Sequence, residues 1–525
     1  MKRILAVPLA VLFLCSARPA GAQTMTTDAL LDTLQHTAFN YFWNEANPLN
    51  GLIKDRSTSD SPCSIASTGF GLSGICVGVD RGWVSRSAAA ARVLTTLQTF
   101  WNGPQSSIGD GTIGYKGFFY HFLDMNTGLR TWSSELSSID TALLLAGILD
   151  AKQYFDGSDP NEQQIRALAD SINQRVDWNF MRNFNQGVLM GWKPGTGFAG
   201  FGQWIGYNEA MILYILALGS PTHAVPTNAW ARWTSGYVWG SWYGYDFVQF
   251  PPLFGHQYSH CWVDFRSIRD AYMTSQSSTY YENTRRATLA QRAYCIANPG
   301  GFVGYGTDLW GLTAGDGPSG YNARGAPPAQ NDDGTIAPTA AITSLIFAPD
   351  EVWPVIYNLW NRYRAQMFGP YGFTDGLNPG QNWFDTDVLG IDQGPILLML
   401  ENYRTGSIWQ RFMRNAEIQN GLTRAGFTQL TVEVPVAGVS GLEFAASPNP
   451  SRGGTRLRFR LPAEGAVRLS VFDVAGREIA RPIAAWLPAG ERILTLNDAG
   501  WPAGLYVYRL EANGMTRTVR GVRLP

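Results

Sequence analysis

The sequence predicts a mainly α protein in which a helical α/α toroid is followed by a small all-β, Ig-like sandwich. About a dozen segments between residues 27 and 419 repeat apolar residues at helical spacing. Loops rich in Gly, Trp and Tyr separate them, such as 187–207 and 301–334. After residue 442 the pattern changes to short runs that alternate with a period of two.

The first 22 residues predict a signal peptide. Lys2 and Arg3 precede an apolar run over 4–15, and small residues at 20–22 form a cleavage site. This run is too short to span a bilayer, and no later stretch is apolar enough to do so. We therefore expect an exported protein without a membrane span that begins at Gln23 and is periplasmic, on the cell surface or extracellular.

The toroid is predicted over residues 23–425, followed by a linker over 426–442. Apolar periodicity predicts longer helices over 27–43, 85–101, 133–155, 161–178, 208–218, 279–297, 348–364, 392–404 and 407–419. Shorter helices are expected near 64–78, 226–237, 262–273 and 337–346. In a ring of helix pairs the connecting loops gather at one mouth, and we expect the functional site there.

The sandwich is predicted over residues 443–525. Strands are expected over 456–461, 467–472 and 505–510, with turn signals at 475–476 and 488–490. This region has 12 Arg, no Lys and 7 acids, whereas residues 23–442 carry 34 acids against 25 basic residues. The difference in composition supports two separate domains.

Composition excludes several classes of protein. With 45% hydrophobic and 15% charged residues, the chain is not disordered. A net charge of −1 without long runs of like charge argues against nucleic acid as a partner. Of the 19 Trp, 17 lie before residue 443, and such an aromatic content is typical of large cores or of surfaces that stack on sugar rings.

Four cysteines remain after removal of the signal peptide. Cys63, Cys76, Cys261 and Cys295 predict up to two disulfides in an oxidising compartment, Cys63 with Cys76 and Cys261 with Cys295, or else buried thiols. No Cys/His cluster indicates a metal site.

Three acids are the catalytic candidates. Asp140 has leucines at its helical neighbours, so its carboxylate must be paired or face a cavity. Glu135 and Glu209 fit either a first-turn acid that compensates the helix dipole or a catalytic group. Glycoside hydrolysis uses two carboxylates, one to protonate the leaving oxygen and one to activate water or attack the sugar.

Polar and aromatic residues cluster around these acids in a way that fits a sugar cleft. The substrate-binding candidates are Asp55, Arg56, Trp132, Gln203, Trp204, Tyr207, His260, Trp262, Arg266, Trp383, Asp387 and Asp392. The alternation of Asp385 and Asp387 is also compatible with a calcium site. Asp392 is expected to cap the helix that follows it.

Ordered blocks from about residue 30 to 420 carry a family resemblance. They are Phe39–Trp43, Gly51–Ser57, Gly117–Phe122, Ser134–Leu143, Gly206–Ala210, His256–His260, Gly311–Pro318, Tyr371–Asp375 and Gly390–Pro395. Together they resemble the glycoamylase-like family that contains bacterial endo-β-1,2-glucanases. The resemblance implies an (α/α)6 barrel, no cofactor, and inverting cleavage of β-1,2-glucan to sophorose-type oligosaccharides, with Glu135, Asp140 and Glu209 as the acids.

The tail carries a second resemblance. Ser447–Pro450, Val471–Gly476 and Pro502–Tyr508 resemble C-terminal secretion-sorting domains and related Ig-like modules. This implies the secretion machinery or the cell surface as a partner of residues 443–525.

These observations predict a secreted glycoside hydrolase whose partner is an oligo- or polysaccharide. Glu209 is expected to be the general acid, and Asp140 or Glu135 the base or the group that positions water. The alternatives are an exo-acting or α-specific glucosidase, a polysaccharide lyase, and a glycan-binding protein without catalysis. An excess of acids over bases in the toroid argues against the lyase, which needs basic residues for uronates.

Overall fold

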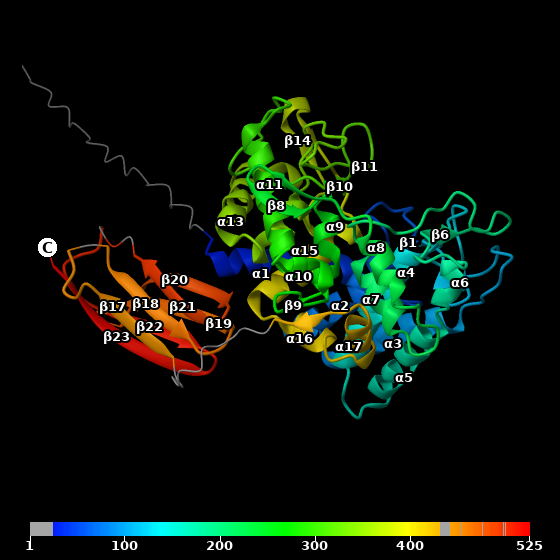
Figure 1. Cartoon of the computed structure of the whole chain (residues 1–525), viewed down its shortest axis with the longest axis horizontal. Coiled ribbons are helices and arrows are strands. Elements are labelled where there is room, and N and C mark those ends of the chain that lie inside the picture. Colours follow the sequence, from blue (N-terminus) through cyan, green and yellow to red (C-terminus); the bar gives the residue numbers. More distant parts are fainter. Residues whose placement is uncertain are drawn as a thin grey trace, which may run out of the picture.

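Helices of two kinds alternate along the first domain. The computed structural model describes residues 25–430 and 442–524, except 453, 475, 497 and 499. One set of helices is buried on nearly all sides, and the other exposes one face to solvent. Figure 1 shows helices of both sets in the domain that precedes the β-strands of the tail. This difference follows from sequence, since a helix that is apolar all round must lie inside a protein.

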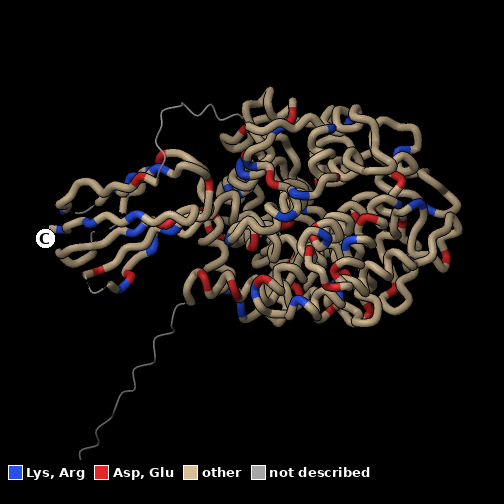
Figure 2. Tube along the Cα trace, turned by 90° about the horizontal axis from the view of Figure 1, so that it is seen from below, with Lys and Arg blue, Asp and Glu red and all other residues tan. Residues whose placement is uncertain are grey.

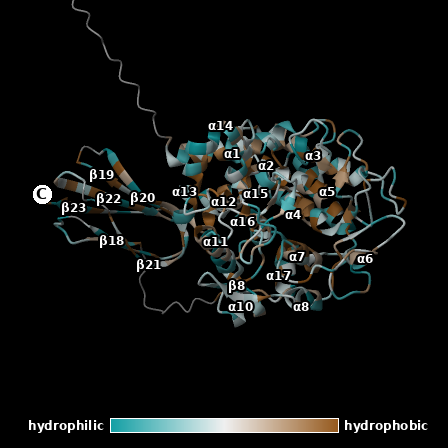
Figure 3. Ribbon diagram, turned by 90° about the horizontal axis from the view of Figure 1, so that it is seen from above, coloured by the Kyte–Doolittle hydropathy of each residue, from teal (hydrophilic) through white to brown (hydrophobic). Residues whose placement is uncertain are grey.

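The inner helices form a ring. They are α2 (Ile65–Asp80), α4 (Ser138–Tyr154), α7 (Met211–Gly219), α9 (Phe254–Gln257) with η1 (Tyr258–Cys261), α12 (Pro338–Thr343) with η2 (Ser344–Ile346), and α15 (Gly390–Arg404). Neighbours in the ring pack against each other, and α15 packs against α2 to close it. Figure 3 shows α2, α4 and α15 inside the helical domain, with α3 and α5 outside them.

The outer layer consists of amphipathic helices and short segments. They are α1 (Thr27–Asn44), α3 (Arg86–Asn102), α5 (Pro160–Arg175), α6 (Trp178–Arg182), α8 (Asn228–Thr234), α10 (Ala271–Ser275), α11 (Tyr280–Ala297), α13 (Pro349–Asn358), η3 (Leu359–Tyr363), α14 (Arg364–Met367), α16 (Ser407–Phe412) and α17 (Ala416–Arg424). The predicted toroid is therefore confirmed.

Short antiparallel strand pairs connect the helices. They are β1 (Cys63–Ser64) with β4 (Phe122–Leu123), β2 (Gly114–Tyr115) with β3 (Phe118–Phe119), β5 (Leu136–Ser137) with β6 (Gly191–Trp192), β7 (Trp239–Trp242) with β8 (Tyr245–Val248), β9 (Ile268–Arg269) with β16 (Thr428–Gln429), β10 (Ala314–Gly315) with β11 (Asn322–Ala323), β12 (Phe368–Gly369) with β13 (Gly372–Phe373), and β14 (Leu377–Asn378) with β15 (Trp383–Phe384). The turn η4 (Pro379–Gln381) joins the last pair. β1 and β5 lead directly into α2 and α4, and the final serine of each strand caps the helix that follows.

Several predicted helix bounds are wrong. The segment 133–155 becomes helical only at Ser138, because Trp132 and Ser133 have φ angles of +56° and +50°. The segment 208–218 begins at Met211, and 407–419 divides into α16 and α17. Residues 262–273 contain β9 and the short α10 rather than one helix, because β9 pairs with β16.

The four cysteines correct the disulfide interpretation. Cys63, Cys76, Cys261 and Cys295 are free thiols, and all are buried. Burial raises the pKa of the Cys63 thiol to about 12, so it stays protonated at neutral pH.

The second domain is an antiparallel β-sandwich, as predicted. One sheet contains β17 (Glu443–Ser447), β18 (Arg456–Leu461) and β21 (Gly490–Thr495). The other has the order β20 (Glu478–Leu487), β19 (Gly465–Phe472), β22 (Gly504–Ala512) and β23 (Met515–Arg523). Burial alternates along β18, where Leu457 and Phe459 enter the core while the arginines that alternate with them are exposed. Basic residues recur along the traces of this domain (Figure 2).

The two domains touch at a small polar and aromatic surface. Arg481 of β20 forms an ion pair with Asp28 of α1 at 3.3 Å. The guanidinium of Arg266 lies between the rings of Trp409 and Trp486, at 4.6 and 5.2 Å from their centroids. Within 25–430 and 442–524, no helix has the length and apolar character needed to cross a membrane.

Two boundary predictions remain open. β16 pairs with β9, so residues 428–429 of the predicted linker still belong to the helical domain. The rest of the predicted linker up to residue 441, and the predicted signal peptide, lie outside the described residues.

Candidate active site

A cavity of about 330 Å³ lies where several inner helices begin. Its polar lining comes from Asp55, Arg56, Ser64, His121, Asp140, Glu209, Tyr258 and Tyr321. Asp140 is in the first turn of α4, Glu209 precedes α7 by two residues, and Asp55 and Arg56 lie shortly before β1 and α2. The ring thus brings together residues that are up to 266 positions apart in the sequence.

Glu209 is a carboxyl group with a strongly shifted pKa. Its side chain is partly buried, and it does not sit in a helical turn as predicted, because α7 begins at Met211. Burial raises its pKa to about 7, its own backbone N–H lowers the pKa by a smaller amount, and the negative charge of Asp140 makes the smallest contribution, which raises it. A carboxyl of this kind can hold a proton near neutral pH.

His121 joins the other two acids. Its Nδ1 lies 3.0 Å from Glu135 Oε1, and its Nε2 lies 3.6 Å from Asp140 Oδ1. Burial alone would lower the pKa of His121, but the two carboxylates outweigh it and raise the pKa to about 9. The imidazolium therefore stays charged at neutral pH, and its ring stacks on Phe122 at a centroid distance of 3.9 Å.

The contact with His121 also determines the pKa of Glu135. Burial would raise its pKa, but the hydrogen bond and charge of His121 lower it. Glu135 is not a first-turn acid, because it precedes β5 and α4. Asp140 is fixed separately, since the Ser137 hydroxyl donates a hydrogen bond to its carboxylate. Asp140 thus faces the cavity and has partners, as its apolar surroundings in the sequence predicted.

Arg56 neutralises a second group of acids beside the cavity. Its guanidinium lies 2.9 Å from Asp316, 3.3 Å from Asp387 and 3.5 Å from Asp55. Burial would lower the pKa of Arg56, but these carboxylates raise it above its ordinary value. Burial also raises the pKa of Asp55, against the effect of Arg56.

Three more carboxyl groups are buried behind Arg56. Burial raises the pKa of Asp375 to about 6 and that of Asp385 to about 7. Burial and the negative charge of the neighbouring Asp375 raise the pKa of Asp392. The prediction that Asp392 caps α15 is wrong, because the cap position is Leu389 and Asp392 lies inside the first turn.

The same region contains a set of oxygens that could hold a cation. Asp316, Asp375 and Asp385 each place a carboxylate oxygen within 4.8 Å of the others. Asp387, the other member of the predicted calcium pair, is not in this set and faces Arg56. The nearby guanidinium already supplies positive charge to Asp316.

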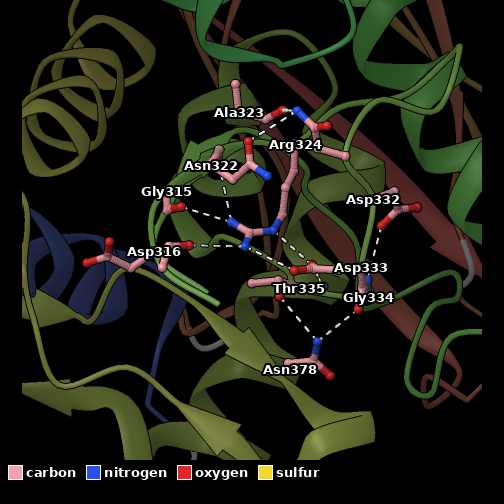
Figure 4. Close-up of polar contacts among 12 residues, drawn as sticks. Gly315, Asp316, Asn322, Ala323, Arg324, Asp332, Asp333, Gly334, Thr335 and Asn378 are labelled. Carbon is pink, nitrogen blue, oxygen red and sulfur yellow. Dashed lines mark hydrogen bonds and ion pairs between the residues drawn. The ribbon is translucent and has the colours of Figure 1, made fainter. Parts of the chain in front are cut away.

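A β-hairpin that is held in place by side-chain hydrogen bonds forms one wall of the cavity. The loop between β10 and β11 carries Asp316 and Tyr321, and Ala314 and Tyr321 line the cavity. Arg324, which is almost fully buried, donates to the Gly315 carbonyl at 2.8 Å and to both Asp333 oxygens at 2.8 and 3.0 Å (Figure 4). These bonds hold both ends of the hairpin in place.

Three of the predicted substrate contacts lie away from the cavity. Trp262 is fully buried, where its indole N–H donates to Ser73 at 2.8 Å. His260 is also fully buried in the core, and burial lowers its pKa to about 3. Arg266 pairs with Asp264 and faces the sandwich. The structure therefore corrects these three assignments.

The aromatic loop before α7 acts mainly as support. Trp204 is nearly buried and donates to the Ser138 hydroxyl at 2.9 Å, Tyr207 is buried, and Gln203 accepts from the Gly187 amide at 3.0 Å. Trp383 lies on β15 and does not line the cavity. Trp132, by contrast, is 66% exposed, and its ring contacts Phe122 of the cavity lining.

Some site residues were missed in the sequence. His121 was noticed only within the block Gly117–Phe122, and Tyr258 only within His256–His260. Asp375 likewise ends the block Tyr371–Asp375, whereas Tyr321 lies in a loop whose local pattern gives no signal. A lone His or Tyr becomes informative only when its carboxylate neighbours, which are distant in sequence, are known.

The chain is similar to proteins of known name. A family model described as "Putative glucoamylase" (Glycoamylase) matches residues 202–416. The chain is 30% identical over 438 residues to a Parabacteroides distasonis protein named exo beta-1,2-glucooligosaccharide sophorohydrolase (non-reducing end). That match covers 77% of this chain and 59% of the relative, so the chain spans only about three fifths of its length.

Two solved structures share the fold closely. A "putative glucoamylase" from Bacteroides uniformis is 34% identical with a TM-score of 0.72, over 78% of this chain and 99% of that one. An endo-β-1,2-glucanase from Chitinophaga pinensis, solved with sophorotriose and glucose, is 30% identical with a TM-score of 0.71, over 77% of this chain and 99% of that one. Residues 202–416, which the family model matches, lie in the helical domain.

Proposed function

Because this chain belongs to the glycoamylase family, we propose that it is a glycoside hydrolase that acts on β-1,2-glucans. The observation that carries the proposal is Glu209, whose carboxyl has a pKa of about 7 and shares one cavity with Asp140. An acid and a second carboxylate around a cavity are what hydrolysis of a glycosidic bond requires.

In the proposed reaction, Glu209 protonates the glycosidic oxygen as the bond to the anomeric carbon breaks. Asp140 accepts a proton from the water that attacks that carbon. His121 and Ser137 hold the Asp140 carboxylate, and Glu135 holds His121. Glu135 is thus a positioning residue that acts through His121, rather than the base. Asp55, Arg56 and Asp387 remain candidates for contacts with sugar hydroxyls.

The finer proposal is internal cleavage to sophorose-type oligosaccharides with inversion of the anomeric centre. Similarity to the C. pinensis endo-β-1,2-glucanase supports it. The second candidate is exo action at the non-reducing end, which similarity to the P. distasonis sophorohydrolase favours. Endo and exo cleavage use the same acids. They differ in how far the cavity extends along the glucan chain beyond the bond that is cleaved.

The test is a panel of β-1,2, β-1,3, β-1,4 and α-1,4 glucans with analysis of the products. A ladder of oligosaccharides from β-1,2-glucan at early times indicates endo action, and one short product from the start indicates exo action. Activity on starch alone would contradict the proposed linkage. Proton NMR of early products reads the anomer, because inversion and retention require different carboxyl separations, roughly 6.5–9.5 Å and 5–5.5 Å.

We also propose that residues 1–22 direct export and that the sandwich serves secretion or attachment to the cell surface. The Arg-rich composition and Ig-like fold of residues 443–525 support a role separate from catalysis. Fractionation of cells that express the full chain or a chain ending at Ser440 tests this. Identical distribution of the two proteins would contradict the role of the sandwich.

A further inference from the structure

Trp132 is held in a backbone conformation that tryptophan rarely adopts. Trp132 and Ser133 have consecutive positive φ angles in a tight turn between Thr131 and Ser134, whose amide donates to the Thr131 carbonyl at 3.1 Å. Such positions usually hold Gly, Asn or Asp, because other residues are strained there. The strain is maintained by the fold, since the Thr131 amide and the Ser134 hydroxyl both donate to the Phe122 carbonyl.

This strained turn presents the indole to solvent. Trp132 is 66% exposed, although large aromatic side chains normally gain from burial. Its ring contacts Phe122 at a centroid distance of 5.2 Å, and Phe122 stacks on His121 at 3.9 Å. A continuous series of rings therefore leads from the catalytic cavity to the rim. Backbone strain that displays a functional group is a feature of binding sites.

A second cavity begins at Trp132. It has a volume of about 500 Å³, and its polar lining includes Lys54, Asp60, Asn47 and Asn126. The two cavities are lined by neighbouring residues of the same chain segments, such as Lys54 beside Asp55, and Asp124 close to Phe122. Phe122 lines the inner cavity and its ring contacts Trp132 of the outer one, so the two cavities meet at this pair of rings. Glu45 and Lys54 form an ion pair at 2.7 Å that fixes part of the outer wall.

We infer that this outer cavity is a second sugar-binding subsite, in which Trp132 stacks on a glucose ring of a glucan whose scissile bond lies beside Glu209. The inference rests on the proposed function and extends it. An exposed indole offers the flat apolar face that a pyranose ring covers, and amide and carboxylate groups around it can bind hydroxyls. Short oligosaccharides fill only the inner cavity, whereas longer chains also reach Trp132.

The experiment measures kcat/KM on β-1,2-gluco-oligosaccharides of increasing length for the wild-type enzyme and for Trp132→Ala. We expect a fall of about tenfold on long chains and no change on the shortest cleaved substrate, the fold-change typical of losing one aromatic contact. Trp132→Phe should restore most of the activity on long chains.

Trp132→Gly separates binding from structure. Glycine adopts positive φ without strain, so this variant should keep or raise the thermal unfolding midpoint while it loses activity on long chains. Phe184→Ala is the matched control, because Phe184 is likewise an exposed aromatic residue at a positive φ but lines neither cavity. Phe184→Ala should change neither the thermal unfolding midpoint nor the activity on long chains.

The outcomes distinguish the two proposals. An active Trp132→Ala whose kcat/KM falls equally at all chain lengths, or does not fall at all, overturns the outer subsite alone. A Trp132→Gly that unfolds at a lower temperature shows that Trp132 serves the fold and also overturns it. A wild-type enzyme that cleaves no β-1,2-glucan of any length overturns the proposed function, and the subsite with it.

Discussion

Replacing Glu209 by Gln should abolish turnover and, at the same time, stabilise the folded protein at alkaline pH. The pKa of Glu209 is about 7 in the folded protein, against an ordinary value of 4.5. The folded state therefore keeps a proton that the unfolded chain releases between these two values. The stabilisation that this retained proton gives the folded state is fully present below about pH 4.5 and is lost as the pH rises through 7.

The size of the effect follows from the two pKa values. Each tenfold difference in proton affinity corresponds to about 1.4 kcal/mol, so the ionised Glu209 costs the native state about 3 kcal/mol at pH 8. Gln carries no charge and escapes this cost. With an unfolding entropy proportional to length, a domain of about 400 residues should gain roughly 3–4 °C in its thermal midpoint.

Thermal unfolding of the wild type and Glu209→Gln between pH 4 and pH 8 measures this difference. We expect the midpoints to lie close together at pH 4 and to separate progressively towards pH 8. Turnover of the variant should fall by on the order of 100-fold or more, as for loss of a general acid. A difference in midpoint that is independent of pH would refute the assigned pKa. Near-wild-type turnover would refute the acid role and direct attention to Asp387 and Asp392.

Four other changes test separate parts of the structure. His121→Gln removes the cation that links Glu135 to the proposed base Asp140, so kcat/KM should fall at least about tenfold in steady-state kinetics; an unchanged kcat/KM would exclude this role. Arg324→Lys loses the two-point contact with Asp333 that pins the β10–β11 hairpin, and KM should rise more than kcat falls in steady-state kinetics. Arg411→Met leaves the Asp150 carboxylate buried without its partner, which should destabilise the protein by about 3–5 kcal/mol in denaturant unfolding while the folded variant stays active. A chain that ends at Ser440 should hydrolyse soluble glucan at the wild-type rate, because none of the sandwich residues that the structure describes lines the cavity of Glu209 and Asp140; a large loss in a folded truncation would show otherwise.

Local signals predicted much of the fold. Thr26, Ser85 and Thr279 cap helices that begin within a residue of the predicted positions, because a cap acts on the amides of the next turn. The helix expected from residue 133 begins late, because the turn at Trp132 follows tertiary hydrogen bonds rather than propensity. The prediction of two disulfides was wrong for a similar reason. Whether two cysteines can pair depends on the distance between their elements, and the sequence does not give that distance.

The site was predicted in part. Asp140 was found because a carboxylate among leucines has few explanations. Trp262 and His260 were placed wrongly, because a polar and aromatic segment has the same composition whether it lines a cleft or fills a core. His121 owes its charge to Glu135 and Asp140, which lie on a different segment, and so no local pattern marks it.

Closure of the helical ring has consequences for how the chain folds. The final contact joins α2 to α15, and Glu401 receives hydrogen bonds from Gln35 and Arg81, which precede it by more than 300 residues. Such long loop closures slow folding, and this one must wait until residue 404 has been synthesised. Before that step, the apolar sides of α2 and α15 are available to other chains, which favours aggregation at high concentration. Since Asp55 and Ile391 line the same cavity, recovery of activity during refolding should report this last closure.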